Sequence, residues 1–276
     1  MPLVSSLRRL VPAVPVLSRA RWAMLPLDLL DRALNLPWRE FRNIPPNRMR
    51  LRVGVGNRLL FNAAHFRLLP INFWIDALNA RIVSLDSTIL DIGSGCGRFA
   101  FPLREFDFHG RRFTGRYIGV DLDAEMIDWC RRRFPPDRFE FHVVPGRSKT
   151  YGTDHPSPAR LPVPDASMGL VLANSLFTHL LEDDVVAYLK EAARALRPGG
   201  YVQFSAFVIE DVRAHPDPRW TFRHRQGVAW VESPKYPEAA VAYEREWFDG
   251  LRDALGLQAE APMAHHTHTM MRWRRP

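Results

Sequence analysis

The stretch from Thr88 to Ala100 reads TILDIGSGCGRFA, and it decides the fold. Its apolar beginning, Ile89 to Ile92, predicts a short buried strand, and its end, from Arg98 to Leu103, predicts a helix. Glycines between the two turn the backbone sharply, because a residue without a Cβ adopts positive φ freely and lets a ligand approach the main chain. A strand, a glycine turn and a helix N-terminus together present free backbone N–H groups, so we predict a nucleotide-type cofactor site.

The spacing of the glycines separates three kinds of cofactor site. A phosphate-binding P-loop needs a lysine directly after its glycines, and none follows here. The dinucleotide fingerprint G-x-G-x-x-G needs its third glycine where Arg98 stands. The observed pattern, D-x-G-x-G-x-G beginning at Asp91, resembles motif I of the class I S-adenosylmethionine (SAM) methyltransferases. This resemblance implies a doubly wound, mostly parallel seven-stranded α/β sheet, with an N-terminal helical cap and a C-terminal antiparallel hairpin.

The resemblance also implies SAM as the cofactor and assigns residues to it. The carboxylate of Asp91 helps to hold the amino group of the methionine moiety, and the glycine turn packs against methionine and ribose. Asp121, which ends the second predicted strand, suits the acidic residue that accepts hydrogen bonds from the ribose hydroxyls, although a dehydrogenase would share it. The expected cofactor-binding residues are Asp91, Gly93, Ser94, Gly95, Gly97, Asp121, Leu122, Met126, Asn174 and Ser175.

Two later stretches resemble the same family. Residues 170–181, LVLANSLFTHLL, match its segment after the fourth strand, where Asn174 and Ser175 would face the methyl donor. His179 in this segment is a candidate general base or substrate contact, and a histidine that fixes the loop through the backbone is an equal alternative. Residues 195–201, ALRPGGY, resemble the turn before the fifth strand, which breaks a helix and returns the chain to the sheet.

Two positions depart from the family pattern. Gly169 stands where an aspartate often precedes the apolar run of the fourth strand. Residues 142–145, HVVP, offer no acidic or amide side chain for the adenine amine after the third strand. Adenine recognition is then expected to use backbone groups and apolar packing. Two consequences are open to test: weaker binding of the cofactor, or an enzyme that has lost its activity.

The rest of the chain alternates strands and helices, which predicts a parallel doubly wound sheet. The predicted strands are Ile89–Ile92, Tyr117–Val120, Phe139–Val143, Leu170–Ala173 and Tyr201–Phe207. The predicted helices are Leu25–Ala33, Asn57–Leu69, Asn72–Ile82, Ala124–Arg133, Glu182–Leu196 and Ala239–Leu255, with Pro70 dividing the second from the third. The predicted hairpins are Phe222–Val231, turning at Gly227, and Leu257–Trp273, turning near His265 and His266.

Charge and composition suggest two parts. Residues 1–56 form a basic, proline-containing arm, and residues 57–276 form the SAM-dependent domain with a lid-like, aromatic insertion at about 208–238. Residues 1–58 hold eleven arginines and three acidic residues, an excess equal to the net charge of +8 of the whole chain. The two cysteines imply no disulfide framework and favour a reducing compartment.

These features predict a SAM-dependent methyltransferase that acts on a small-molecule, lipid or glycan acceptor. Two alternatives stay open, a non-catalytic SAM-binding partner or regulatory protein and a nucleic-acid methyltransferase, the last resting only on the basic arm. We predict no metal site, because His265, His266 and His268 read as surface strand residues. We expect a cytoplasmic protein with a peripheral membrane contact through the arm as a further option, and an arginine-rich, acid-poor start also suits an organelle transit peptide.

Overall fold

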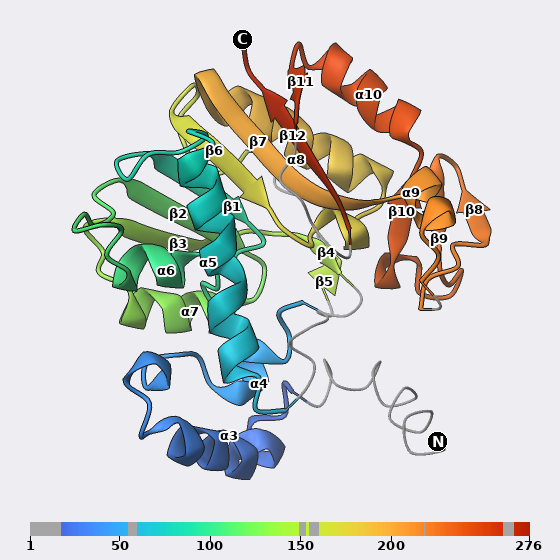
Figure 1. Cartoon of the computed structure of the whole chain (residues 1–276). Helices are drawn as coiled ribbons and strands as arrows, with labels where there is room; N and C mark the ends of the chain where they lie inside the picture. The colour runs from blue at the N-terminus through green and yellow to red at the C-terminus, as the bar shows by residue number, and fades with distance from the viewer. Residues whose placement is uncertain (1–17, 55–59, 149–152, 155–159, 218, 262–267) are drawn as a thin grey trace.

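The computed structural model describes residues 18–54, 60–148, 153–154, 160–217, 219–261 and 268–276 of the 276-residue chain. Its centre is a twisted sheet with helices on both faces (Figure 1). Seven strands form the expected core in the spatial order β3-β2-β1-β6-β7-β12-β11. These strands are β1 (Thr88–Ile92), β2 (Arg116–Asp121), β3 (Phe139–Val143), β6 (Met168–Ala173), β7 (Leu196–Val208), β11 (Gln258–Glu260) and β12 (Thr269–Arg274).

Strand direction confirms the fold class predicted from the sequence. The pairs β1–β2, β1–β6, β2–β3 and β6–β7 are all parallel. Strand β12 runs antiparallel to both β7 and β11, which is the expected C-terminal hairpin. The turn of this hairpin, with His265 and His266, lies outside the described residues.

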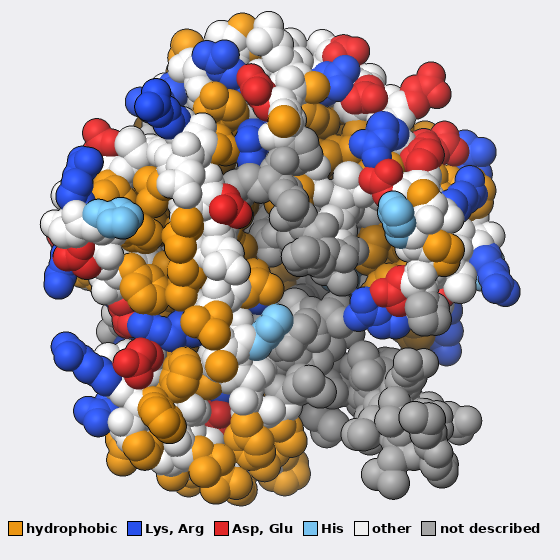
Figure 2. All heavy atoms as spheres, in the orientation of Figure 1, with side chains coloured by type: hydrophobic (Ala, Val, Ile, Leu, Met, Phe, Trp, Pro, Cys, Tyr) orange, Lys and Arg blue, Asp and Glu red, His pale blue; other side chains and the backbone are white. Residues whose placement is uncertain are grey.

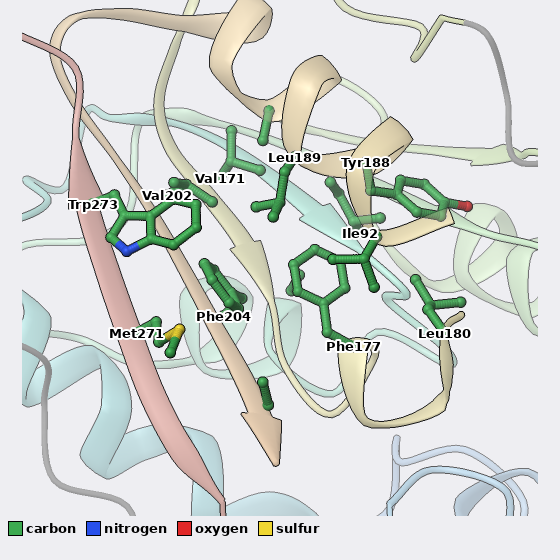
Figure 3. Packing of buried hydrophobic residues seen from close by; sticks show 14 of the residues in the cluster. Ile92, Val171, Phe177, Leu180, Tyr188, Leu189, Val202, Phe204, Met271 and Trp273 are labelled. Carbon is green, nitrogen blue, oxygen red and sulfur yellow. The ribbon is translucent and has the colours of Figure 1, made fainter. Parts of the chain in front are cut away.

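Each face of the sheet has its own hydrophobic core. Helices α5 (Ala63–Asn79), α6 (Ala100–Glu105) and α7 (Ala124–Arg133) bury Trp74, Phe101 and Met126 against one face. Helices α8 (Glu182–Ala195) and α10 (Arg245–Ala254) cover the other face. There Phe204 packs against the rings of Phe177 and Trp273, and Leu189 of α8 belongs to the same cluster (Figure 3). The carboxyl ends of the parallel strands are therefore held between two packed layers, and this edge is where open α/β sheets bind ligands.

The insertion after β7 extends the sheet. Strands β8 (His224–Gln226) and β9 (Ala229–Val231) form the predicted hairpin, and Gly227 between them has the positive φ that its turn requires. Strand β10 (Val241–Tyr243) joins this hairpin to the end of β7, and a short helix, α9 (Ile209–Ala214), precedes it in the chain. A short hairpin, β4 (Arg147–Ser148) with β5 (Thr153–Asp154), lies apart from the main sheet.

Two helix predictions were wrong. The predicted helix Ala239–Leu255 begins only at Arg245, because Val241–Tyr243 is buried as strand β10 between β7 and β9. The apolar residues at 239–243 fit the spacing of a helix and that of a strand equally well, and only pairing with distant strands decides between the two. The predicted break at Pro70 is absent, since α5 runs through it.

Packing on both sides of Pro70 explains the continuous helix α5. Phe66 before the proline and Trp74 after it are fully buried, and the indole Nε1 of Trp74 donates to the carbonyl oxygen of Phe99 at 2.8 Å. These contacts outweigh the single helical hydrogen bond that a proline removes. The helix was predicted to begin at Asn57 but begins at Ala63, so residues 60–62 are not helical, and residues 57–59 lie outside the described residues.

The N-terminal arm folds back onto the domain. It contains α3 (Arg21–Asn35), which is longer than predicted, a 3₁₀ turn η1 (Arg39–Phe41) and α4 (Asn47–Arg50). Arg50 has no exposed surface, and its guanidinium donates to Asp31, Asn62 and the carbonyl oxygen of Pro45 at 2.6–2.7 Å. Among the described helices, none has the length and apolar character needed to cross a bilayer.

We expect Arg50→Met to lower the free energy of unfolding by about 3–5 kcal/mol, because it leaves the Asp31 carboxylate buried without its partner. Urea denaturation measures this change. Arg32→Met, at an exposed position on the same helix as Asp31, is the matched control and should change the stability by less than about 0.5 kcal/mol. Equal effects of the two substitutions would contradict the assigned role of Arg50.

Candidate active site

The glycine turn follows β1 at the carboxyl edge of the sheet. Gly93, Gly95 and Gly97 have φ values of +77°, +54° and +77°, which only glycine adopts without strain. A Cβ on Gly97 would lie 2.9 Å from the ring of Phe134, so this turn has no room for a side chain. The helix that follows, α6, starts at Ala100, two residues later than predicted.

Asp91 lies at the end of β1 and is almost completely buried. Its carboxylate accepts a hydrogen bond from the hydroxyl of Tyr117, which reaches across from β2. Burial raises the pKa of the Asp91 carboxyl to about 7, although the Tyr117 hydroxyl favours the ionised form and the charge of Asp121 opposes it. The site therefore holds an acid that titrates near neutral pH and that a cationic ligand would ionise.

Asp121 ends β2 and ties the glycine turn to that strand. One carboxylate oxygen accepts from the backbone N–H of Gly95 at 2.8 Å, and the other accepts from that of Asp123 at 2.9 Å. Burial raises the pKa of Asp121 to about 6, against these N–H donors. Asp123 caps α7 by accepting from the N–H groups of Glu125 and Met126, so capping does not occupy Asp121.

The N-terminal arm packs directly onto the glycine turn. Arg52 donates to Asp123 at 2.8 Å and to Glu125 at 2.6 Å, while Arg48 also reaches Glu125. These ion pairs place Val53 against Gly95, with a methyl group 3.1 Å from where a Cβ would stand. The sequence analysis did not assign Arg52 and Val53 to the site, because nothing local in residues 48–54 shows which distant strand they meet.

Arg98 is a second residue that sequence reasoning left without a role. It follows the turn directly and is 6% exposed. Neither its Nε nor its Nη2 has a hydrogen-bond partner among the described residues. The Nη1 atom lies 3.1 Å from where a Cβ of Gly54 would stand, and burial lowers the pKa of the guanidinium to about 10. A buried cation without a partner is costly, so this position suits an anionic ligand group.

The segment after β6 approaches the same turn. The side chain of Leu176 lies 3.4 Å from where a Cβ of Gly93 would stand, which brings Asn174 and Ser175 to the edge of the site. Ser175 has a φ of +57°, and its N–H donates to the hydroxyl of Ser205 at 2.6 Å. This hydrogen bond holds a left-handed backbone conformation that a serine would otherwise disfavour.

His179 points toward the insertion. It lies in a 3₁₀ turn, η3 (Phe177–His179), and its Nδ1 is 3.1 Å from the carbonyl oxygen of Glu238 in η4 (Pro237–Ala239). Because a carbonyl oxygen only accepts, this contact assigns the proton to Nδ1 and makes Nε2 the basic nitrogen. The contact anchors the loop, and it is compatible with His179 acting as a general base through Nε2.

The remaining predicted residues lie around the two carboxylates. Met126 is buried, with its sulfur 3.7 Å from the Cβ position of Gly95, and Leu122 is in contact range of Gly146. Ser94 is buried, and its Oγ has no partner among the described residues. The departure at Gly169 is remote from this edge, because Gly169 lies at the start of β6 and donates to Thr88.

Comparisons with known proteins agree with this geometry. Residues 90–204 match the family model described as a methyltransferase domain. This match covers the strands and turns from which the resemblance to class I methyltransferases was drawn. A stretch of 134 residues, 48% of the chain, is 34% identical to a fatty-acid O-methyltransferase of Mycolicibacterium smegmatis and covers 40% of that protein. Another of 119 residues, 42% of the chain, is 32% identical to an arsenite methyltransferase of Aquipseudomonas alcaligenes and covers 32% of it.

The chain thus spans well under half the length of these two relatives. A solved structure from Pyrococcus horikoshii shares the fold, with a TM-score of 0.51 and 16% identity over 76% of this chain and 93% of that one.

The match to a methyltransferase domain implies SAM as the cofactor, and the residues fit it. The narrow glycine turn gives the close backbone approach that a nucleoside needs, and Asp121 would receive the ribose hydroxyls. Asp91 would hold the methionine amino group, and the unpaired guanidinium of Arg98 suits the methionine carboxylate.

We expect the affinity for SAM to fall as the pH drops from about 7.5 to about 5.5, because the raised pKa of Asp91 leaves its carboxyl protonated there. Isothermal titration calorimetry measures the fall, which approaches tenfold per pH unit for one linked proton. In Tyr117→Phe the fall should begin at higher pH, since the hydroxyl that favours the ionised carboxylate is gone. Tyr236→Phe, at an exposed position, is the control, and identical profiles for both variants would contradict this assignment.

The same shift has the opposite sign for the stability of the ligand-free protein. The folded protein keeps the Asp91 proton up to pH about 7, whereas the unfolded chain releases it near 3.8. Because the folded state binds more protons between these values, its stability should fall as pH rises through this window. Urea denaturation of wild type and Asp91→Asn at several pH values isolates this contribution.

We expect Arg98→Met to lower the affinity for SAM at least about tenfold while leaving the ligand-free protein equally or more stable, because the substitution removes an unpaired buried charge. Decarboxylated SAM, which lacks the carboxylate, should bind wild type and variant equally. Arg132→Met, an exposed position on α7, is the control. An equal loss of affinity for both ligands would show that Arg98 does not contact the carboxylate.

Proposed function

We propose that the protein transfers a methyl group from SAM to a small-molecule or lipid acceptor. The observation that carries this proposal is a pair of carboxylates, the buried Asp91 and the partly buried Asp121, on either side of the glycine turn in a region that matches a methyltransferase domain. The relative named as a fatty-acid O-methyltransferase supports a lipid acceptor. The relative named as an arsenite methyltransferase shows how widely acceptors differ around this kind of domain.

The protein's part in such a reaction is mainly positioning. Bound SAM supplies an activated methyl group on a sulfonium, which leaves as a neutral thioether. The chain would fix the cofactor through Asp91, Asp121 and the turn, and would exclude water from the acceptor. The loop at Asn174 and Ser175 touches the turn through Leu176, so it is placed to border the acceptor.

Replacement of His179 should affect transfer to two kinds of acceptor differently. A carboxylate acceptor is already ionised at neutral pH and needs no base. A hydroxyl acceptor must lose a proton, and Nε2 of His179 is the basic nitrogen if Nδ1 donates to Glu238. His179→Gln should therefore slow transfer to a hydroxyl about a hundredfold or more and transfer to a carboxylate much less.

The two alternative functions are less well supported. The nucleic-acid reading rested on the basic arm, but Arg48, Arg50 and Arg52 pair with carboxylates inside the protein. A non-catalytic SAM-binding role rested on the departures from the family pattern. Gly169 lies away from the cofactor edge, so it gives no reason to expect loss of activity, and this alternative now rests only on the lack of an acidic or amide side chain at residues 142–145.

The test is methyl transfer from labelled SAM to a panel of fatty acids, phenols, glycans and short RNA, with products identified by mass spectrometry. We expect a methylated lipid or small molecule from wild type and at least about tenfold less from Asp91→Asn, which loses a charged hydrogen bond to SAM. Asp128→Asn, on the exposed side of α7, is the control. SAM binding without any product across the panel would favour the regulatory alternative, and methylated RNA alone would favour the third.

A further inference from the structure

Helix α3 turns its carboxylates inward and its apolar side chains outward. Asp28 accepts from Arg48 at 2.6 Å, and the buried Asp31 accepts from Arg50 at the same distance. The side chains that face away from the domain are apolar, and the continuation of the chain after α3 adds two more. The exposed members of this surface, called the α3 surface below, are Trp22, Leu25, Leu29, Leu30, Leu34, Leu36 and Trp38.

The α3 surface is too apolar for a water-exposed helix. Trp22 is 83% exposed and Leu29 is 58% exposed, whereas surface helices usually turn such residues toward the core. Figure 2 shows hydrophobic side chains crowded over this helix at the lower end of the molecule. A contiguous exposed apolar patch of this kind marks an interaction site.

The charges around the α3 surface point to an anionic partner. Within residues 18–54 the exposed charged side chains are Arg21, which pairs with Glu125 at 2.8 Å, and Arg32, Arg39, Arg42 and Glu40. The two aspartates of α3 are held inside by ion pairs, so they do not oppose a negative surface. The exposed charge is therefore mainly positive, and it surrounds a leucine-rich face with a tryptophan near each end.

We propose that the α3 surface docks into the interface of a lipid bilayer that contains anionic lipids. Leucine side chains on one helical face enter the acyl boundary, tryptophans prefer the headgroup level, and arginines attract anionic headgroups. The apolar face carries this inference, because Arg48, Arg50 and Arg52 are engaged inside the protein. The charge of the arm made peripheral membrane contact one option in the sequence analysis, and the apolar face of α3 now provides the main argument for it.

The docked helix is directly linked to the cofactor turn. Arg48 donates both to Asp28 on α3 and to Glu125 on α7, beside the capping residue of that helix. The chain then continues through α4 to Val53, which packs on Gly95. Docking would thus hold the methyltransferase site next to the bilayer, although binding itself does not depend on the proposed reaction.

The test is flotation of the full-length protein with vesicles of phosphatidylcholine alone or mixed equally with phosphatidylglycerol. We expect binding to the mixed vesicles, and an at least about tenfold weaker binding of the double variant Leu29→Gln/Leu34→Gln, which lacks two exposed leucines that would enter the bilayer. The matched control Ile75→Gln/Val143→Gln removes two exposed aliphatic side chains outside the α3 surface and should bind like wild type.

Two further measurements separate this proposal from its competitors. Binding should persist in about 0.5 M salt, which screens charge attraction but not apolar insertion. Brominated lipids should quench the fluorescence of Trp22 and Trp38, the only exposed ones of the eight tryptophans. Binding that disappears at high salt and ignores the leucine substitutions would overturn the proposal. Absence of vesicle binding would overturn it too, and a dimer that the leucine variant converts to monomer would then assign the surface to a second copy.

Discussion

The carboxylate of Asp121 joins the parts that the cofactor site requires. Through the N–H of Gly95 it fixes the glycine turn after β1, and through that of Asp123 it fixes the start of α7 after β2. Even partial burial of such a group is unfavourable unless donors compensate, and here the backbone N–H groups of Gly95 and Asp123 do so. The turn, the strand ends and the helix start are therefore held as one unit before any ligand arrives.

Asp91 is compensated less completely, and this difference has a chemical meaning. Its described hydrogen-bond donor is the Tyr117 hydroxyl, and its pKa rises to about 7, above the value of about 6 for Asp121. Arg98 shows the complementary situation, a buried guanidinium whose Nε and Nη2 have no partner among the described residues. The two groups flank the glycine turn in the sequence, a carboxylate with no described cation beside it and a guanidinium with no described anion beside it. A zwitterionic amino-acid moiety would satisfy both groups, which is the physical case for the methionine part of SAM.

The sequence predicted what local patterns determine. Strand β3 and helix α7 have the predicted bounds, because Phe139–Val143 alternates in burial and Asp123 and Phe134 bound a clear helical segment. The positive φ angles of the motif glycines follow from the spacing alone. Strand β10 and the unbroken helix α5 were missed because their state depends on partners far along the chain. The contributions of Arg52 and Val53 were missed for the same reason.

The arm shows how one set of ion pairs can serve two surfaces. If Asp28 and Asp31 faced water, α3 would be an ordinary amphipathic helix with its leucines against the domain. Arg48 and Arg50 instead draw these aspartates inward, and the helix must then present its leucines outside. The same Arg48 also binds Glu125, at the first turn of the helix that follows Asp121. The outward direction of the α3 leucines and the packing of the arm on the glycine turn therefore share a cause. The net charge of +8 does not show this, because several arginines of the arm form ion pairs inside the protein.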